Sequence, residues 1–397
     1  MEKILELRAQ LLTKLPAKYG NYLFFSALGF YLISQFINGT MYIVYYPSES
    51  FPYRLWMIAG ALALLKIMLF DQFKDQKELA LYVAVGLLIL AGCISSQAWD
   101  FLYYYLMIVA ARGIDFHLIL KEFLVIISVG LVLTFISAKL GLIMGLTNSR
   151  DGSAAIRYAL GTVYPTDLAS RLFYLMLAYA LYKKFRFDLP EYIGLFAMTA
   201  WMYIVTDTRL DMLLMLAIIF CGLLKEKVIK MLQYLKLKWI ATLAFGSIFF
   251  VIIMTYLYQP SNLLFRVVNK VLSGRLAVGQ LAFERYNVTL FGQMVIQNGN
   301  GGIHKGPFDY FFIDCSFLKI LMMNGIVSFF ILLGGIFYLL KRALKNQAYS
   351  LAMAVLLVIL SSLIDHHMLE ISYNIIFIAL LADITSFSKE KVVSIRK

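Results

Sequence analysis

Charged residues are scarce in this chain of 397 residues: Asp, Glu, Lys and Arg make up only 15% of it, whereas 61% of the residues are hydrophobic. Water-soluble domains are about 45–50% apolar and about one quarter charged. A soluble core of this size would not hide so much apolar surface, so the composition excludes a water-soluble globular protein. The apolar runs are about 17–25 residues long, which predicts membrane-spanning helices and not the shorter strands of a barrel.

Cysteine is rare, and nucleotide-binding motifs are missing. Cys93, Cys221 and Cys315 are scattered singly, without the spacing of metal ligands or of a disulfide framework. The Gly-rich stretch 298–306 lacks the strand–loop–helix context of a phosphate cradle, so we interpret it as a flexible lid or turn. The sequence therefore predicts no cofactor and no metal site. Membrane topology, described below, accounts for the formal net charge of +13 without a nucleic-acid partner.

The apolar blocks predict an all-α, polytopic membrane protein that forms a single domain over residues 1–397. About twelve transmembrane helices are expected, near 22–38, 54–70, 79–95, 98–112, 122–145, 166–183, 189–205, 209–224, 238–258, 322–341, 348–364 and 371–387. The segment 1–20 is amphipathic and is expected to lie along the cytoplasmic membrane surface. No internal repeat is evident, which counts against inverted-repeat transporter folds.

Basic residues divide the loops into two sets. One set, which includes both termini, holds 23 of the 36 lysines and arginines and is therefore predicted to be cytoplasmic by the positive-inside rule. Two cytoplasmic termini require an even number of spans, in agreement with twelve. The other set faces outward and includes one long loop, 259–321, in which residues 309–321 are amphipathic and fit a re-entrant or interfacial helix.

The two sets differ in the kind of cation that they carry. The cytoplasmic loops contain eighteen lysines and five arginines, whereas the outward half contains eight arginines and four lysines. Arginine grips phosphate with a planar fork of donors and keeps its charge when desolvated. We therefore predict a partner rich in phosphate or carboxylate oxygens at the outer face. The arginines proposed to bind it are Arg157, Arg209, Arg275 and Arg285, with Arg266 in a secondary role.

Structural uses of the outer arginines and their neighbours stay open. Asp167 and Arg171 are four residues apart on one predicted helix and can form an ion pair. Arg209 stands at the outer end of a predicted helix, where the helix dipole favours an anion. In the same stretch, Thr206 or Thr208 can cap that helix.

Acid–base candidates occur on the same outer face. The stretch "LIDHHMLEISYN" (363–374) contains His366, His367 and Glu370, and a helix would place His366 and Glu370 on one side. A base that titrates near neutral pH, with a carboxylate to orient it, can take a proton from a hydroxyl. A simple His–Glu hydrogen bond at a helix start is the alternative. The pair also resembles half of a metal site, but no third ligand is near in sequence. Asp314 is a further candidate base.

Several stretches, in this order, resemble the Wzy-type bacterial polysaccharide polymerases, which are related to the O-antigen polymerases and ligases. They are "RYALGTVYPTDLA" (Arg157, Gly161, Pro165, Asp167), "TDTRLDMLL" (Arg209), "SGRLAVGQLAFERYNVTLFGQ" (Arg275, Phe291, Gly292), "DCSFLKILMMNGI" (Asp314, Gly325) and "DHHMLEISYNIIFI". The resemblance covers roughly residues 150–385. One departure is Asp167, where the pattern has asparagine.

The resemblance implies a glycosyltransferase with a multi-helical fold of the C type, located in the bacterial cytoplasmic membrane. Its substrates would be polyprenyl-pyrophosphate-linked oligosaccharide repeats, which it would join into capsular or exopolysaccharide at the outer face. Its implied partners are the lipid bilayer and the flippase and chain-length regulator of the same pathway. Two alternatives remain: a ligase that transfers finished glycan to another acceptor, and a flippase or transporter of the lipid-linked sugar.

Overall fold

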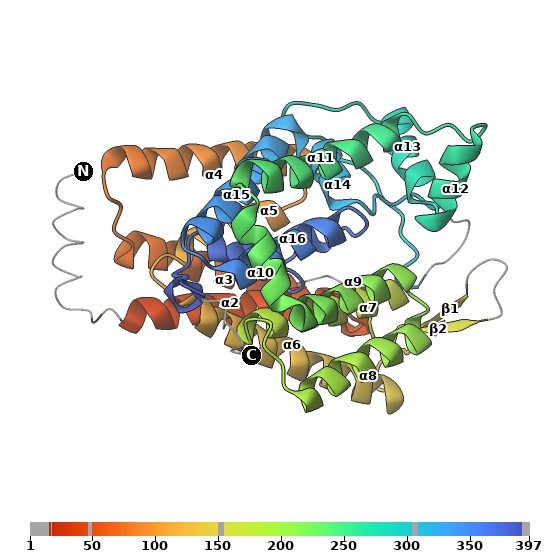
Figure 1. Cartoon of the computed structure of the whole chain (residues 1–397), viewed down its shortest axis with the longest axis horizontal. Coiled ribbons are helices and arrows are strands. Elements are labelled where there is room, and N and C mark those ends of the chain that lie inside the picture. The colour runs from red at the N-terminus through yellow and green to blue at the C-terminus, as the bar shows by residue number, and fades with distance from the viewer. Residues whose placement is uncertain (1–15, 17, 47–49, 150–154, 304–308, 391–397) are drawn as a thin grey trace.

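The computed structural model describes residues 16, 18–46, 50–149, 155–303 and 309–390, and it is mostly helical. Long helices run roughly side by side, while two short helices and a small hairpin gather at one end of the bundle (Figure 1). The α-helices are α2 (Lys18–Asn38), α3 (Ser50–Phe70), α4 (Gln76–Ser96), α5 (Asp100–Ala110), α6 (Phe116–Lys139), α7 (Pro165–Tyr182), α8 (Leu189–Thr206), α9 (Arg209–Leu223), α10 (Lys225–Tyr234), α11 (Leu237–Tyr256), α12 (Leu263–Val271), α13 (Arg275–Arg285), α14 (Ser316–Met323), α15 (Gly325–Lys345) and α16 (Tyr349–Ser362). Single 3-10 turns form η1 (Met41–Tyr45), η2 (His367–Leu369), η3 (Ile376–Leu380) and η4 (Thr385–Phe387).

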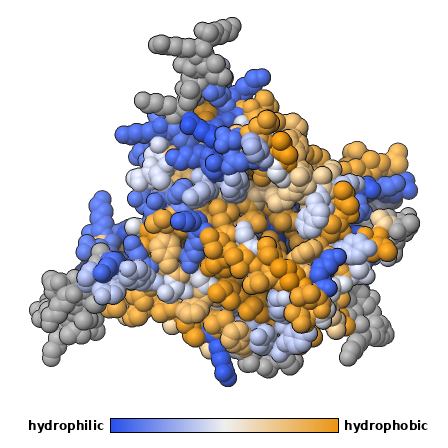
Figure 2. All heavy atoms as spheres, turned by 90° about the horizontal axis from the view of Figure 1, so that it is seen from below, coloured by the Kyte–Doolittle hydropathy of each residue, from blue (hydrophilic) through white to orange (hydrophobic). Residues whose placement is uncertain are grey.

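Five of these helices are long and apolar enough to cross a membrane: α3, α4, α6, α11 and α15. In α3, α4 and α11 only 22% of the apolar window is buried inside the protein. On α6, Val129 and Val132 are more than half exposed, and on α8 Ile204 is 77% exposed. Figure 2 shows a broad hydrophobic surface bordered by hydrophilic zones. Apolar surface of this extent needs a lipid environment, so the prediction of an all-α membrane protein is confirmed at this level.

Not every predicted span is a helix of spanning length. The helices α5 and α16 are apolar but contain only 11 and 14 residues. At about 1.5 Å per residue, neither would cross a hydrocarbon core of about 30 Å unaided. The segment 1–20, predicted to lie on the membrane surface, falls almost wholly outside the described residues.

The predicted helix over 371–387 is wrong, because this segment forms the turns η3 and η4 and no α-helix. Its side chains are apolar because they are enclosed by protein: Ile378 and Ala382 have no exposed surface. Arg342 of α15 donates hydrogen bonds to the carbonyl oxygens of Ala379, Leu380 and Ala382, at 2.7–2.9 Å. Non-helical backbone is tolerated at membrane depth where protein satisfies its polar groups. Hydropathy does not distinguish this buried, non-helical segment (371–387, called the strap below) from a lipid-facing helix.

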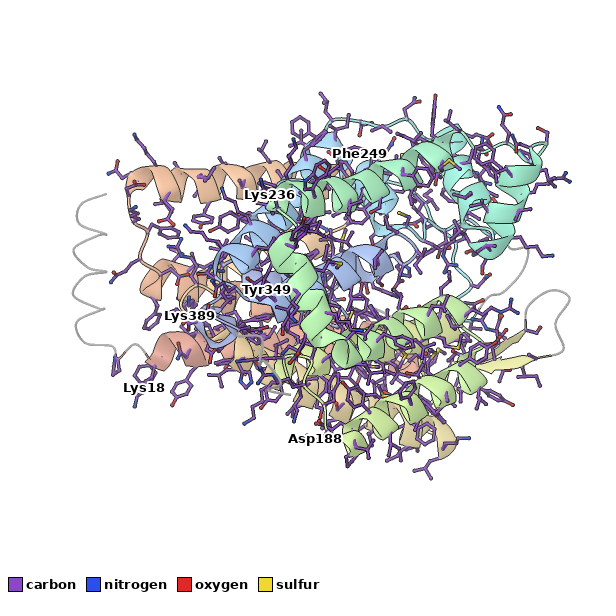
Figure 3. The ribbon with its side chains drawn as sticks, in the orientation of Figure 1. Lys18, Asp188, Lys236, Phe249, Tyr349 and Lys389 are labelled. Carbon is purple, nitrogen blue, oxygen red and sulfur yellow. The ribbon has the colours of Figure 1, made fainter. Side chains whose placement is uncertain are left out.

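The region 259–321 is more structured than a loop. It contains α12, α13 and, at its end, the start of α14, which begins at Ser316 and not at Asp309. The outward segment 146–165 also contains a two-stranded antiparallel hairpin, β1 (Thr147–Ser149) and β2 (Ile156–Tyr158), which an all-α expectation omits. Both lie at the same end of the bundle (Figure 1), whereas Lys18 and Lys389 lie toward the other end (Figure 3).

A close crossing of two glycines holds the region 259–321 against the bundle. Gly292 and Gly325 both have positive φ, of 84° and 86°. A Cβ on Gly292 would lie 2.0 Å from the carbonyl oxygen of Met323, and one on Gly325 would lie 2.3 Å from the nitrogen of Gly292. Only glycine permits this approach of two backbones. The crossing joins the chain after α13 to the α14–α15 junction.

Candidate functional site

A cavity of about 390 Å³ lies where three distant parts of the chain meet. It is lined by the start of α7, by the Gly-rich stretch with the chain that follows it, and by the turn after α16. The lining residues are Gly39, Val163, Tyr164, Thr166, Asp167, Gly299, Asn300, Gly301, Gly302, Tyr310, Phe312, Asp314, His366, His367, Glu370 and Tyr373. All four acid–base candidates from the sequence, Asp314, His366, His367 and Glu370, are therefore brought to one cavity.

Short-range structure explains how these segments reach the cavity. Pro165 occupies the first turn of α7, where its missing N–H is harmless, and this start places Asp167 in the same turn. The backbone N–H of Ser316, at the start of α14, donates to the carbonyl oxygen of Asp365 at 3.0 Å. The Ser316 hydroxyl also accepts from the N–H of Met368, at 3.3 Å. These bonds fix the turn that carries both histidines.

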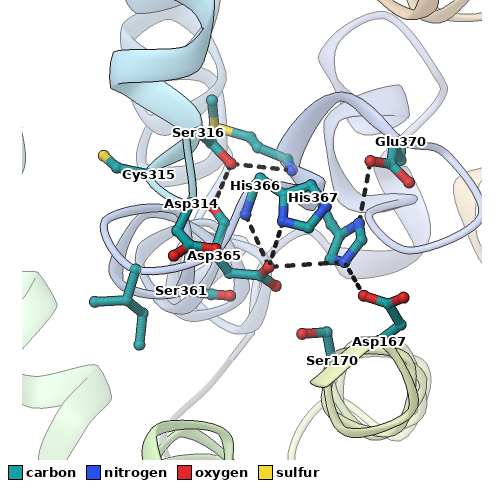
Figure 4. Close-up of polar contacts among 12 residues, drawn as sticks. Asp167, Ser170, Asp314, Cys315, Ser316, Ser361, Asp365, His366, His367 and Glu370 are labelled. Carbon is teal, nitrogen blue, oxygen red and sulfur yellow. Dashed lines mark hydrogen bonds and ion pairs between the residues drawn. The ribbon is translucent and has the colours of Figure 1, made fainter. Parts of the chain in front are cut away.

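His367 is the centre of a buried ionic network (Figure 4). Its Nδ1 lies 3.1 Å from Glu370 Oε1, and its Nε2 lies 3.6 Å from Asp167 Oδ1 and 3.8 Å from Asp365 Oδ1. The side chain is only 5% exposed. A 3-10 turn, and not the predicted helix, carries the two residues, so Glu370 faces His367 at a spacing of three residues.

Burial and charge act in opposite directions on the pKa of His367. Burial alone lowers this pKa, but the charges of Glu370 and Asp365, together with the nearby Asp167 carboxylate, raise it to about 10. Burial alone would raise the pKa of Glu370, and the charge of His367 instead brings it down to about 2. At neutral pH the two side chains therefore form an imidazolium–carboxylate pair.

His366 has a different environment although it is the next residue. Its ring packs edge-on against Phe312, with centroids 4.6 Å apart, and lies 3.8 Å from the ring of His367. Burial and the positive charge of His367 hold the pKa of His366 well below its usual range. His366 is thus neutral, with its Nδ1 3.6 Å from Asp365 Oδ1. Burial also raises the pKa of Asp365.

Arg171 lies behind the cavity and is 1% exposed. Its guanidinium stands 4.1 Å from the ring centroid of Tyr373 and 4.8 Å from that of Phe36. The Tyr373 ring is also stacked on His367, at 3.7 Å between centroids. None of the three guanidinium nitrogens has a hydrogen-bond partner among the described residues. The predicted ion pair of Arg171 with Asp167 is therefore absent from the described structure, and Asp167 faces His367 instead.

Asp314 and Arg275 form the opposite side of the site. Arg275 Nε donates to the carbonyl oxygen of Ile364 at 2.7 Å and lies 3.7 Å from Asp314 Oδ2. Burial raises the pKa of Asp314 in spite of the nearby arginine. Lys319 of α14 lies 5.6 Å from the ring centroid of Phe312 and also lines a smaller cavity of about 40 Å³. Because this smaller cavity shares His366 and Glu370 with the larger one, the two are adjacent.

The five arginines predicted to bind pyrophosphate are not brought together. Arg275 lies 3.7 Å from Asp314, which lines the cavity. Arg157 is buried, donates to the carbonyl oxygen of Thr206 at 2.7 Å and lies 5.5 Å from the ring of Tyr164, a lining residue. Arg285 is exposed and 3.2 Å from Asp309 Oδ2. Arg209 and Arg266 are exposed and do not line the cavity.

Thr206 and Thr208 do not cap α9 with their side chains. The hydroxyl of Thr206 donates instead to the carbonyl oxygen of Met202, at 2.8 Å. The Gly-rich stretch lines the cavity from Gly299 to Gly302, and the N–H of Gly302 donates to the carbonyl oxygen of Val163 at 2.9 Å. The remainder of that stretch, from His304, lies outside the described residues.

The structure adds one group of possible metal ligands that the sequence did not predict. Asp167, His366 and His367 each offer a ligand atom, and these atoms lie within 4.8 Å of one another. The sequence pattern had paired His366 with Glu370, whereas this group joins His366 to His367 and to Asp167, which lies about 200 positions earlier in the chain. Asp365, Arg171 and Tyr373 were also not among the predicted site residues. The sequence could have indicated Asp365, because this residue directly precedes the two histidines. No sequence pattern indicated that Arg171 would be buried beside the site.

Comparisons of the chain with protein-family models, with curated proteins and with solved structures find no match. The function must therefore be argued from the chemistry of the cavity.

Proposed function

We propose that this protein is a glycosyltransferase of the bacterial cytoplasmic membrane that polymerises polyprenyl-pyrophosphate-linked oligosaccharide repeats. The observation that carries the proposal is the cavity itself, which gathers carboxylates, imidazoles and aromatic rings at the end of the bundle where α12, α13 and the hairpin lie. Cavities of a few hundred Å³ with a few convergent polar groups are typical of small-molecule sites. The resemblance of residues 150–385 to Wzy-type polymerases names the substrate class.

The proposal includes the finer topology expected from the sequence. The chain crosses the membrane about twelve times in a bundle of the C type, with both termini in the cytoplasm and the cavity at the outer face. The strap after α16 supplies one crossing without an α-helix. Lys18 and Lys389, at the end of the bundle away from α12, agree with this orientation by the positive-inside rule (Figure 3).

Asp314 is the base in this mechanism. A general base needs to face the substrate and to have an appreciable affinity for a proton. Asp314 lines the cavity, and burial raises its pKa above that of an ordinary aspartate. The acceptor hydroxyl oxygen forms a bond to the anomeric carbon of the donor sugar, and its proton passes to the Asp314 carboxylate. The bond from the anomeric carbon to the phosphate oxygen breaks, and lipid pyrophosphate leaves.

Arg275 and Lys319 stabilise the leaving pyrophosphate. Arg275 lies 3.7 Å from Asp314 and Lys319 lies 5.6 Å from the ring centroid of Phe312, so each cation is next to a residue that lines the cavity. Fixed donors aimed at developing charge contribute about 3–4 kcal/mol each in other enzymes. The rings of Tyr310 and Phe312 line the cavity and offer apolar surface on which sugars can pack.

The proposal is tested with purified full-length protein and lipid-pyrophosphate repeats in the absence of nucleotide sugar. The wild type is expected to build a ladder of oligomers. Asp314→Asn is expected to slow ladder formation by about 10²–10⁴-fold, the usual contribution of a general base. Asp309→Asn is the matched control, because Asp309 is 72% exposed, does not line the cavity and pairs with Arg285; it should retain activity. Full activity of Asp314→Asn would contradict the assignment of the base.

The form of the product separates this function from the alternatives. A ligase would move a preformed chain to a different acceptor in a single step and would give no ladder. A flippase would move the lipid-linked repeat across the membrane without forming a glycosidic bond. Either result with the wild type would overturn the proposed polymerase.

A further inference from the structure

The turn after α16 and the start of α7 together offer more than an ionic network. We infer that Asp167, His366 and His367 bind a divalent transition-metal ion, with Asp365 as a second carboxylate beside both histidines. The ion would lie in the wall of the cavity. No step of the proposed polymerase mechanism requires it. This inference rests on the geometry of the cluster and not on the proposed polymerase.

The distances within the cluster fit ligands of one ion better than hydrogen bonds. Nε2 of His367 lies 3.6 Å from Asp167 Oδ1 and 3.8 Å from Asp365 Oδ1, and His366 Nδ1 lies 3.6 Å from the same Asp365 oxygen. Side-chain hydrogen bonds are about 2.7–3.2 Å long, so these separations are too great. Two ligands that each lie about 2.0–2.2 Å from one ion in tetrahedral geometry are about 3.3–3.6 Å apart. The ligand atoms of Asp167, His366 and His367 all lie within 4.8 Å of one another, so side-chain rotations that shorten these separations by up to about 1 Å would bring them to tetrahedral spacing.

An unpartnered buried oxygen points to the same conclusion. Asp365 is 9% exposed, and its Oδ2 has no hydrogen-bond partner among the described residues. Its Oδ1 faces both imidazoles (Figure 4). A buried carboxylate oxygen without a partner costs free energy unless a cation or a donor reaches it. A metal ion between the two histidines would be within reach of this carboxylate.

The ligand types select the kind of ion. Two imidazole nitrogens with carboxylate oxygens suit Zn²⁺, Mn²⁺ and similar transition ions, whereas Mg²⁺ and Ca²⁺ prefer sites made of oxygen alone. His366 and Asp167 also line the cavity, so one side of the ion would face a substrate or water. That arrangement, with protein ligands on one side and an open position on the other, is the form of catalytic and not of structural zinc sites. Because a ligating imidazole must be neutral, the ion would replace the proton on His367.

Side chains around the proposed ligands already hold them in place. Glu370 Oε1 lies 3.1 Å from His367 Nδ1, so it orients the ring through the nitrogen that does not face Asp167. The Tyr373 ring, stacked on His367 at 3.7 Å, fixes the plane of the imidazole. A carboxylate on the far nitrogen of a ligating histidine is a common feature of metal sites.

The test measures binding and does not depend on activity. Full-length protein without an affinity tag, purified in detergent and stripped with a chelator, is dialysed against Zn²⁺, and the bound metal is counted by elemental analysis. We expect one ion per chain. His366→Gln should weaken binding by more than about 100-fold, because even the loss of an outer partner of a ligand costs about 10–100-fold. His117→Gln is the control, since His117 stacks on Tyr182, away from the cavity; it should bind as the wild type does.

A second measurement on the wild type avoids the question of whether the variants fold. Co²⁺ replaces zinc and is added to the stripped protein while visible absorption is recorded. Intense bands of a four- or five-coordinate ion are expected. Absence of stoichiometric Zn²⁺ binding, or only the weak spectrum of hydrated Co²⁺, would overturn the inference. Unchanged binding by His366→Gln would also overturn it. Ladder formation by metal-free protein would support the polymerase and would not contradict metal binding at this site. Failure of the metal-binding test and failure of the proposed function are therefore distinguishable.

Discussion

Two charge-rich parts of the molecule differ in the burial of their charged side chains. The arm formed by α12 and α13 carries Arg266, Lys270 and Arg285 on exposed surface. The turn after α16 carries Asp365, His367 and Glu370, which meet Asp167 in a buried network. Exposed charges are screened by water and contribute little, whereas buried charges shift each other's pKa strongly. Burial, and not the number of cations, therefore distinguishes the turn after α16 from the arm formed by α12 and α13.

Stability should show the largest contrast between the two regions. In metal-free protein, His367→Gln removes the cation between Asp167 and Glu370 and leaves two carboxylates without compensation. Removing one partner of a buried ion pair costs about 3–5 kcal/mol, so we expect a clear fall in thermal stability in detergent, followed by the loss of helical circular dichroism.

The matched change on the arm is Arg285→Gln. Its partner Asp309 is 72% exposed, and exposed ion pairs contribute about 0–1 kcal/mol. An equal loss of stability in the two variants would contradict the distinction drawn between the regions.

Activity should separate Arg275 from Arg285. Arg275→Lys keeps one positive charge but loses the fork that reaches the Ile364 carbonyl oxygen and the neighbourhood of Asp314. We expect the rate of ladder formation to fall about 100-fold, comparable to the loss of one fixed donor in other enzymes. Arg285→Lys should lower the rate by less than about threefold, because this side chain lies outside the cavity. Equal effects would favour the five-arginine clamp expected from the sequence.

The pH dependence of the reaction should show the smallest effect and sharpen the assignment of the base. Asp314 accepts a proton only when ionised, and its pKa is raised by burial. The rate should therefore fall as the pH is lowered through this raised pKa, at a higher pH than for an ordinary aspartate with a pKa of about 3.9. The rate of ladder formation, measured against pH with saturating and with limiting substrate, would show it. A rate independent of pH on the acidic side would exclude Asp314 as the base.

Local features of the fold were predictable from the sequence. The long helices α3, α4, α6, α11 and α15 follow predicted spans because about twenty apolar residues in a row are a local signal. The strap over 371–387 is equally apolar, but it is enclosed by protein and not by lipid. Hydrogen bonds from Arg342 hold its non-helical backbone. Short apolar helices such as α5 show that hydropathy alone does not determine the length of a helix.

The candidate site was predictable only in part. The sequence singled out Asp314, His366, His367 and Glu370, and the structure places all four at one cavity. The sequence also allowed an ion pair between Asp167 and Arg171, because side chains four residues apart on a helix lie close together. Tertiary packing instead directs Asp167 to His367 and encloses Arg171 between Tyr373 and Phe36.

The sequence by itself determined that this is a helical membrane protein with chemically reactive side chains outside its longest apolar helices. Those properties depend on composition and on neighbours along the chain. Because the bilayer has a fixed thickness and a helix a fixed rise per residue, the length of an apolar run predicts a membrane-spanning helix. Only the tertiary structure decided which of many charged residues lose their water and meet. Asp167 and His367 are brought together by the packing of α7 against the turn after α16. Burial at that contact, which no local pattern encodes, gives the two residues their chemistry.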